Sequence, residues 1–146
     1  MGTRSSYRII EKWEDTQENE SGEHILCNVY LQYDGYPQGH PSDTAQWLSQ
    51  GTVVNGLGLQ ETRLVFNGGG CLAAQFIARL KEGPGGTYLH SLDSWGKCCE
   101  DYLYDIVIKS DRSLEFVAYE NYSDTPTEIF RGTPAEFVAK YERVGV

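Results

Sequence analysis

The second half of the chain alternates between apolar and polar residues over four consecutive segments. These segments span residues 87–92, 102–109, 113–122 and 127–131, and short polar turns separate them. A period of two residues is typical of β-strands, and strands that follow one another across short turns usually pair antiparallel. This part of the chain therefore predicts an antiparallel sheet.

The first half adds two more strands. Residues 7–13 and 24–33 have strand patterns, and the acidic, aperiodic residues 14–23 between them predict a mobile loop, so the two strands should form a long hairpin. Residues 1–6 are expected to be flexible. Alternation in the second strand assigns five residues to the core face, including Cys27 as a small buried group. These residues are Ile25, Cys27, Val29, Leu31 and Tyr33.

Three segments predict helices. Residues 41–44 carry the chemistry of a helix start, apolar residues recur at helical spacing over residues 71–82, and residues 133–136 form a capping box with proline at the first helical position. Residues 51–70 fit either short strands or an ordered loop. We expect one α+β domain over residues 1–146, with a mostly antiparallel sheet of about five to six strands and about two to three helices that cover mainly one face.

Composition narrows the class of function. The 146 residues have a net charge of −9, and the 12 basic residues are not clustered in the sequence, which argues against direct binding of nucleic acid. No apolar run approaches the ~20 residues of a membrane span, and the N-terminus lacks the apolar core of a secretory signal. We therefore expect a cytoplasmic protein with free thiols and no membrane contact. The spacing of cysteine and histidine matches no familiar metal site, and we expect neither a metal nor a cofactor.

Three consecutive glycines immediately precede the second predicted helix. Gly68, Gly69 and Gly70 follow Asn67 at the end of an apolar segment and precede Cys71. Glycine permits positive φ angles and close approach of the backbone, while the first N–H groups and the positive dipole end of a helix bind anions. The run therefore predicts either an anion-binding loop or a tight turn from strand to helix.

A second turn, residues 33–41, concentrates aromatic and polar side chains among glycines and prolines. Tyr33 and Tyr36 are candidates for stacking on a ring, and Asp34 is a candidate for accepting hydrogen bonds from hydroxyl or amino groups. The alternative is that the turn only closes one end of the sheet.

Cys71 is the candidate nucleophile, because a helix N-terminus favours the thiolate and His24, His40 or His90 could supply a base. No third, orienting partner is recognisable, and a cysteine beside glycines equally suits a small space. The two carboxylates at residues 100–101 are interpreted as part of a solvated turn and strand edge.

Four segments resemble small uncharacterised proteins encoded by bacteriophages and prophages. The segments are residues 33–37, 54–56, 67–75 and 100–105. In that family an aromatic residue precedes the Asp-Gly-Tyr-Pro turn, as here, and a bulkier residue often stands at the position of Gly69, where this chain departs. The resemblance covers roughly residues 24–110. It implies a phage or prophage origin and a location in the host cytoplasm, and it implies no mechanism.

The leading hypothesis is a non-enzymatic viral or prophage protein that binds a small polar ligand, such as a nucleotide-derived host defence signal that it would sequester. One alternative is an acidic interaction module that inhibits a host enzyme acting on nucleic acid, and another is a Cys71-dependent hydrolase or transferase. A homo-oligomer fits the leading hypothesis, since symmetric interfaces often form binding sites. Gly69→Val is expected to abolish binding without loss of the fold. The predicted ligand-binding residues are Tyr33, Asp34, Tyr36, Asn67, Gly68, Gly69, Gly70, Cys71 and Gln75.

Overall fold

The structure, a computed structural model, describes residues 2–14, 22–56 and 64–142. Its main sheet has the strand order β5-β2-β1-β6-β7-β8, and a small second sheet pairs β3 with β4. The strands are β1 (Ser5–Trp13), β2 (Gly22–Leu31), β3 (Thr52–Val54), β4 (Val65–Asn67), β5 (Thr87–His90), β6 (Tyr102–Ile108), β7 (Leu114–Glu120) and β8 (Thr127–Gly132). The helices are α1 (His40–Ser49), α2 (Gly68–Leu80) and α3 (Pro134–Lys140), with a 3₁₀ turn η1 (Leu92–Ser94).

Neighbouring strands of the main sheet are antiparallel, except that β1 and β6 run parallel. The predicted α+β fold with a mostly antiparallel sheet is therefore confirmed. The hairpin of β1 and β2 also forms as predicted. Strands β6, β7 and β8 form a meander, whereas β5 does not join it and pairs with β2 at the edge of the sheet. Within the described ranges, no helix is both long and apolar enough to cross a membrane.

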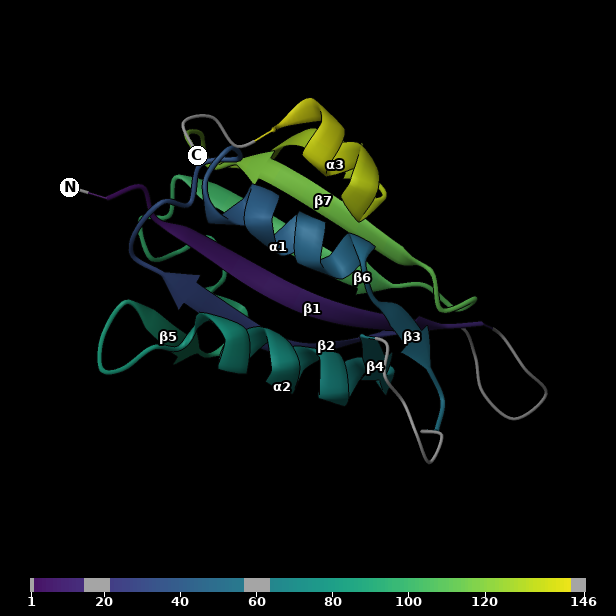
Figure 1. The fold of residues 1–146 in the computed structure, drawn as a ribbon. Helices are drawn as coiled ribbons and strands as arrows, with labels where there is room; N and C mark the ends of the chain where they lie inside the picture. Colours follow the sequence, from purple (N-terminus) through teal and green to yellow (C-terminus); the bar gives the residue numbers. More distant parts are fainter. Residues whose placement is uncertain (1, 15–21, 57–63, 143–146) are drawn as a thin grey trace.

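The three helices α1, α2 and α3 lie on the same face of the main sheet (Figure 1). Between them and the sheet, fully buried aromatic side chains form the centre of the core. The ring of Tyr7 lies 4.9 Å from that of Phe76 and 5.0 Å from that of Tyr104, and the rings of Phe116 and Phe137 are 4.5 Å apart. Tilted and offset rings at these separations attract one another beyond the area that they bury, which fixes each helix over its own strands.

The alternation predicted for residues 24–33 is wrong at both ends of the segment. Strand pairing shifts by one residue between Ile9 and Ile10, so Ile9 faces Cys27 while Ile10 faces Ile25. A β-bulge of this kind turns the following side chains to the other face. Cys27 is buried in the main core as expected, whereas Ile25 packs on the opposite face and Tyr33 is 60% exposed.

The opposite face of the sheet carries a small apolar cluster beside a buried ion pair. Asp105, with a side chain 4% exposed, accepts two 2.8 Å hydrogen bonds from the Arg8 guanidinium, which also lies 3.7 Å from the ring centroid of Trp95. Burial opposes the charge of Arg8, but the hydrogen bond and charge of Asp105 prevail and raise the Arg8 pKa. Tyr119 donates a 3.1 Å hydrogen bond to Asp105, and burial followed by that carboxylate raises the Tyr119 pKa to about 12. The segment that carries Trp95 thus covers part of this face.

Several predicted segment boundaries change. Ser5 and Ser6 are fully buried in β1, so the flexibility expected for residues 1–6 is wrong for these two. Most of the loop predicted at residues 14–23 lies outside the described residues, while its last two residues belong to β2. The undecided segment 51–70 contains the short parallel strands β3 and β4, and its residues 57–63 lie outside the described residues.

Two helix starts differ in how well the sequence predicted them. The capping box of α3 is confirmed, because the Thr133 side chain accepts from the Glu136 N–H at 3.1 Å and the Glu136 carboxylate accepts from the Thr133 N–H at 2.8 Å. These hydrogen bonds lower the Glu136 pKa. Helix α2, in contrast, begins at Gly68 and not at Cys71. The glycine run is therefore the first turn of the helix and not a loop before it.

Candidate functional site

The two turns predicted to share a ligand lie at opposite ends of β1. The Asp34 turn contacts the start of the strand, where the Gly35 N–H donates to the Thr3 carbonyl at 3.0 Å. The glycine run contacts its far end, where the Gly69 N–H donates to Glu11 Oε2 at 2.9 Å. Between Ser5, the first residue of β1, and Glu11, the strand rises by about 20 Å at ~3.3 Å per residue, so the two turns lie at separate ends of the strand. We call the first region, residues 33–40 with the start of β1, the turn end, and the other, the far end of β1 with its surroundings, the pocket end.

Buried polar groups at the turn end are hydrogen bonded to one another. Tyr7 Oη lies 2.8 Å from His40 Nδ1, Ser5 Oγ lies 3.3 Å from His40 Nε2, and the Tyr104 hydroxyl donates to the Gly35 carbonyl at 2.7 Å. Burial raises the pKa of Tyr7 and of Tyr104 well above 10. These contacts support the interpretation of the turn as a structural closure of the sheet.

The three residues predicted to recognise a ligand at the turn end, Tyr33, Asp34 and Tyr36, are all exposed. Tyr33 is 60% exposed and Tyr36 is 39% exposed. Asp34 has a φ of 59°, and its carbonyl accepts the His40 N–H at 3.1 Å. Aspartate tolerates this left-handed conformation better than most residues, so the residue has a structural reason to occupy the position.

The glycine run is built around a carboxylate of the chain itself. Glu11 accepts the Gly69 N–H, and a Cβ at Gly69 would lie 2.6 Å from Leu26 Cδ1 and 3.0 Å from Glu11 Cδ. Gly68 has a φ of 79°, which glycine adopts without strain, and Gly70 faces open space. Glycine at position 69 therefore allows the helix to approach the sheet, and Gly69→Val would disturb packing as well as any ligand.

The remaining predicted residues form hydrogen bonds within the region of β3, β4 and α2. The Asn67 side chain accepts the Gly56 N–H at 2.7 Å, which ties β4 to the segment after β3. The Cys71 thiol donates to Gln75 Oε1 at 3.0 Å, and Gln75 Nε2 donates to the Val65 carbonyl at 3.3 Å. Of the nine predicted ligand-binding residues, Gly68 lines a pocket that the structure defines at the pocket end.

This first pocket, the cationic pocket, has a volume of about 270 Å³. It lies between the end of β1, the segment that follows β3, the first residue of α2 and the turn that joins β6 to β7. Three basic side chains line it, Lys12, Lys109 and Arg112, together with Glu11 and Gly68. Because Glu11 already accepts the Gly69 N–H, part of its negative charge is offset by the helix N-terminus. Lys109 Nζ also lies 3.9 Å from Glu115 Oε2, so Lys12 and Arg112 supply most of the positive charge that favours an anionic group here.

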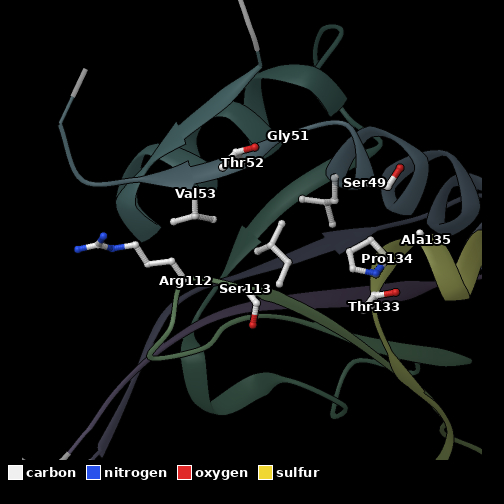
Figure 2. A pocket seen from close by; sticks show the side chains of 11 residues that line it. Ser49, Gly51, Thr52, Val53, Arg112, Ser113, Thr133, Pro134 and Ala135 are labelled. Atoms are coloured by element: carbon white, nitrogen blue, oxygen red, sulfur yellow. The ribbon is translucent and has the colours of Figure 1, made fainter. Parts of the chain in front are cut away.

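A second pocket, the apolar pocket, has a volume of about 320 Å³ and shares Val53 and Arg112 with the first. Its other lining residues come from the end of α1, the turn between β6 and β7, and the start of α3. In Figure 2 the side chains of Val53 and Pro134 project toward the pocket, whereas the guanidinium of Arg112 extends away from Pro134. The two pockets therefore adjoin at Arg112, one lined largely by apolar side chains and the other by a mixture of apolar and polar residues that includes the three cations.

Arg112 occupies a strained position in the β6–β7 turn. Its N–H donates to the Lys109 carbonyl at 2.8 Å, and its φ of 70° is in the left-handed region, where glycine is the usual residue of such a three-residue turn. Asp111 accepts from the Ser113 hydroxyl at 2.6 Å and from the Ser113 N–H at 2.9 Å, and these bonds lower the Asp111 pKa. The turn is thus held rigidly, and it keeps an arginine where glycine would cost less.

Strand pairing brings these cations together, so their sequence positions alone do not predict the cluster. Lys12 and Lys109 are far apart in the chain, but β1 and β6 run parallel and Glu11 pairs with Ile108, the last residue of β6. The residue that follows each member of this pair is a lysine, so both lysines lie at the same end of the sheet. The interpretation of the basic residues as unclustered holds along the sequence and not in space. A residue pattern in β1 or in β6 alone carries no signal of this arrangement.

The structure also shows the surroundings of the cysteine, histidine and carboxylate side chains, and two of them differ from the predictions. Over residues 2–14, 22–56 and 64–142, no group of three or more His, Cys, Asp or Glu residues is arranged to hold a metal ion. The thiol beside a histidine is that of Cys98, 3.6 Å from His90 Nδ1, and not that of Cys71. Glu100 is 2% exposed, so its interpretation as a solvated residue is wrong.

Comparisons with models of protein families, with curated proteins and with solved structures found no match to this chain.

Proposed function

We propose that this chain is a small, non-enzymatic viral or prophage protein that binds a nucleotide-like ligand at the pocket end and sequesters it, as a protein directed against a nucleotide-derived host defence signal would. The adjoining apolar and cationic pockets carry this proposal. A nucleotide has an uncharged ring and an anionic phosphate, and the two pockets offer one suitable environment for each part. The resemblance of the sequence to phage and prophage proteins supports the origin, whereas the role in defence is inferred from the binding of a nucleotide-like ligand, which the two pockets support.

The arrangement of charges favours this end of the molecule. The chain has a net charge of −9, so an anion is repelled by most of the surface. Lys12, Lys109 and Arg112 bring three positive charges to one pocket, where Glu11 is the acidic lining residue and Glu115 lies 3.9 Å from Lys109. Arg112 is the central residue of the proposal, because it lines both pockets and is retained in a left-handed conformation that costs roughly 1 kcal/mol for a residue with a Cβ. Strain kept at a charged side chain beside a cavity is typical of functional positions.

Arg112→Gly tests the proposal, since it should change stability and binding in opposite directions. Glycine relieves the left-handed backbone, so we expect the free energy of unfolding to rise by about 1 kcal/mol. Loss of the guanidinium should weaken AMP binding about tenfold or more, as expected for a charged hydrogen bond. Urea denaturation measures the first quantity and calorimetric titration with AMP the second, with adenosine and inorganic phosphate as half-ligands that should bind more weakly than AMP.

Two control variants make the result specific. Lys97→Gln removes one exposed positive charge outside both pockets, so it should leave AMP binding within twofold of the unaltered protein by the weak effect of exposed charges. Tyr36→Ala alters the turn end and should also leave AMP binding unchanged. Loss of binding in Tyr36→Ala, or equal binding in Arg112→Gly and the unaltered protein, would contradict the assignment to the pocket end.

Native mass spectrometry of freshly purified protein adds an independent observation. A co-purifying mass of nucleotide size that is present in the unaltered protein and absent from Arg112→Gly would support the proposal without any choice of ligand. The same spectrum reports the number of subunits, which tests the expected homo-oligomer.

A second candidate function, docking on a host protein, is favoured by one observation at the sheet edge. Strand β5 is an edge strand without charged residues, and Leu89 is 70% exposed and Tyr88 is 42% exposed. Edge strands with exposed apolar side chains are sites for pairing with another chain. In this case Leu89→Lys, and not Arg112→Gly, should abolish capture of the partner.

A further inference from the structure

A thiol and an imidazole face each other on the segment that connects β5 to β6. Cys98 Sγ lies 3.6 Å from His90 Nδ1 and 3.8 Å from the Ser94 carbonyl oxygen. His90 is the last residue of β5, and both side chains are half-buried. A partly exposed thiol next to a histidine is the arrangement in which a cysteine is activated as a nucleophile, because the imidazole accepts the proton and stabilises the thiolate.

The backbone around Cys98 is held by a buried carboxylate. Glu100 accepts the Cys98 N–H at 2.6 Å, the Gly96 N–H at 3.0 Å and the Ser6 hydroxyl at 2.7 Å. The intervening residue, Cys99, has a φ of 63°, which a residue with a Cβ adopts only when its surroundings enforce it. These hydrogen bonds and the turn at Cys99 hold the backbone that carries the Cys98 side chain.

The histidine is held as firmly as the thiol. Its ring lies 4.8 Å from that of Tyr30 at an interplanar angle of 8°, and strand pairing places His90 beside Asn28 of β2. The Asn28 side chain donates to the Ser91 carbonyl at 2.9 Å and so holds the chain where it leaves β5. Both members of the pair are therefore positioned before any reagent arrives.

The other cysteines have different surroundings. Cys27 is buried in the core, and burial raises its pKa, which disfavours the thiolate. The Cys71 thiol donates to the amide oxygen of Gln75, which does not take up a proton. Cys99 is exposed, and its neighbour Cys98 has the contact with His90. The structure thus distinguishes four thiols of one chain by what surrounds each.

We propose that Cys98 is a site of thiol–disulfide exchange with low-molecular-weight disulfides such as oxidised glutathione. The Cys98 thiolate attacks one sulfur of the disulfide, a new S–S bond forms to Cys98, and the original S–S bond breaks. The released thiolate takes the proton that His90 accepted from Cys98, so the electrons balance without another oxidant. The product is a mixed disulfide, which free glutathione reverses. This site lies outside both pockets, and the inference is independent of the proposed ligand.

The test compares the rates of individual thiols in the folded protein. Oxidised glutathione is added at pH 7 in the absence of oxygen, and the adducts are located by peptide mass spectrometry in a Cys99→Ser background, so that an adduct on that peptide belongs to Cys98. We expect Cys98 to react about tenfold or more faster than Cys71, and Cys27 to react slowest, in line with the effect of thiolate content on exchange. A Cys98 rate equal to or below that of Cys71 would overturn the proposal.

The contribution of His90 is tested by His90→Gln, with His24→Gln as the matched control because His24 is exposed on β2. The first variant should slow Cys98 about tenfold and leave the Cys71 rate unchanged, whereas the control should change neither. An unchanged Cys98 rate in His90→Gln would show that the imidazole does not activate the thiol. The rate at Cys27 reports unfolding in the same sample, and if His90→Gln unfolds, the ratio of Cys98 to Cys71 in the unaltered protein still decides the proposal.

Discussion

At the turn end, Ser5, Tyr7 and His40 are hydrogen bonded to one another inside the protein, whereas at the pocket end Lys12, Lys109 and Arg112 surround open space. The turn of residues 33–41 is rich in aromatic, acidic and histidine residues, and its sequence fits either a ligand-binding turn or a closure of the sheet. In the structure the His40 side chain is hydrogen bonded within the protein, while Tyr33, Asp34 and Tyr36 are exposed and line neither of the two pockets. Residues available to a ligand are those whose side chains converge on a cavity, and convergence depends on strand pairing.

The largest expected effect is the loss of the fold in alkali, and it comes from the turn end. Burial raises the pKa of Tyr7 and of Tyr104 well above the unfolded value near 10. Their stabilising effect is therefore complete below pH 10 and is lost as the pH rises through the folded-state values. Each tyrosine adds up to about 1.4 kcal/mol per pH unit to the slope above pH 10. Urea denaturation between pH 8 and 12 should show this slope, and Tyr7→Phe should reduce it.

Tyr33→Phe is the control for the alkaline experiment, since Tyr33 is 60% exposed and lies in the same turn end. It should leave the slope unchanged. Equal slopes in Tyr7→Phe and Tyr33→Phe would contradict the difference between buried and exposed tyrosines on which the comparison depends.

Two glycine substitutions compare the packing at the turn end with the packing at the pocket end. A Cβ at Gly39 of the turn end would lie 2.2 Å from the Asp34 carbonyl oxygen, and a backbone atom cannot move aside easily. We expect Gly39→Ala to lower the free energy of unfolding by about 2–3 kcal/mol. At the pocket end, a Cβ at Gly70 would have no atom within 4 Å. Gly70→Ala should therefore raise the free energy of unfolding by about 0.5 kcal/mol, because alanine has the higher helix propensity. Chemical denaturation measures both, and changes of the same sign would show that the two ends do not differ in packing.

A smaller effect than that of Gly39→Ala is expected at the start of α3, beside the apolar pocket. Thr133→Ala removes the side-chain acceptor for the Glu136 N–H and should cost about 1 kcal/mol, whereas Thr133→Ser keeps the acceptor and should cost less than half of that. Thermal unfolding of the two variants measures the difference. If Thr133→Ala lowers the free energy of unfolding as much as Gly39→Ala does, then the pocket end does not accept substitutions more readily than the turn end.

The parts of the fold that sequence predicted well are those with a local cause. The capping box of residues 133–136 works within one helical turn, and the meander from Tyr102 onward follows from alternation and short turns. The error at Ile25 arises because a β-bulge depends on the partner strand, which the pattern of β2 alone does not contain. Likewise, the glycine run predicts a ligand contact at Gly69, whereas in the structure Leu26 and Glu11 approach this position so closely that a side chain would not fit.

The α+β class, the hairpin of β1 and β2, and the capping box of α3 follow from local sequence, because propensity, periodicity and hydrogen bonds between near neighbours need no distant partner. Which polar residues come into contact depends instead on how the strands pair. The parallel pairing of β1 with β6 gathered Lys12 and Lys109 at one cavity, and the segment after β5 set Cys98 against His90. Contacts of this kind depend on the register and order of strands, and residue patterns within one segment do not specify either.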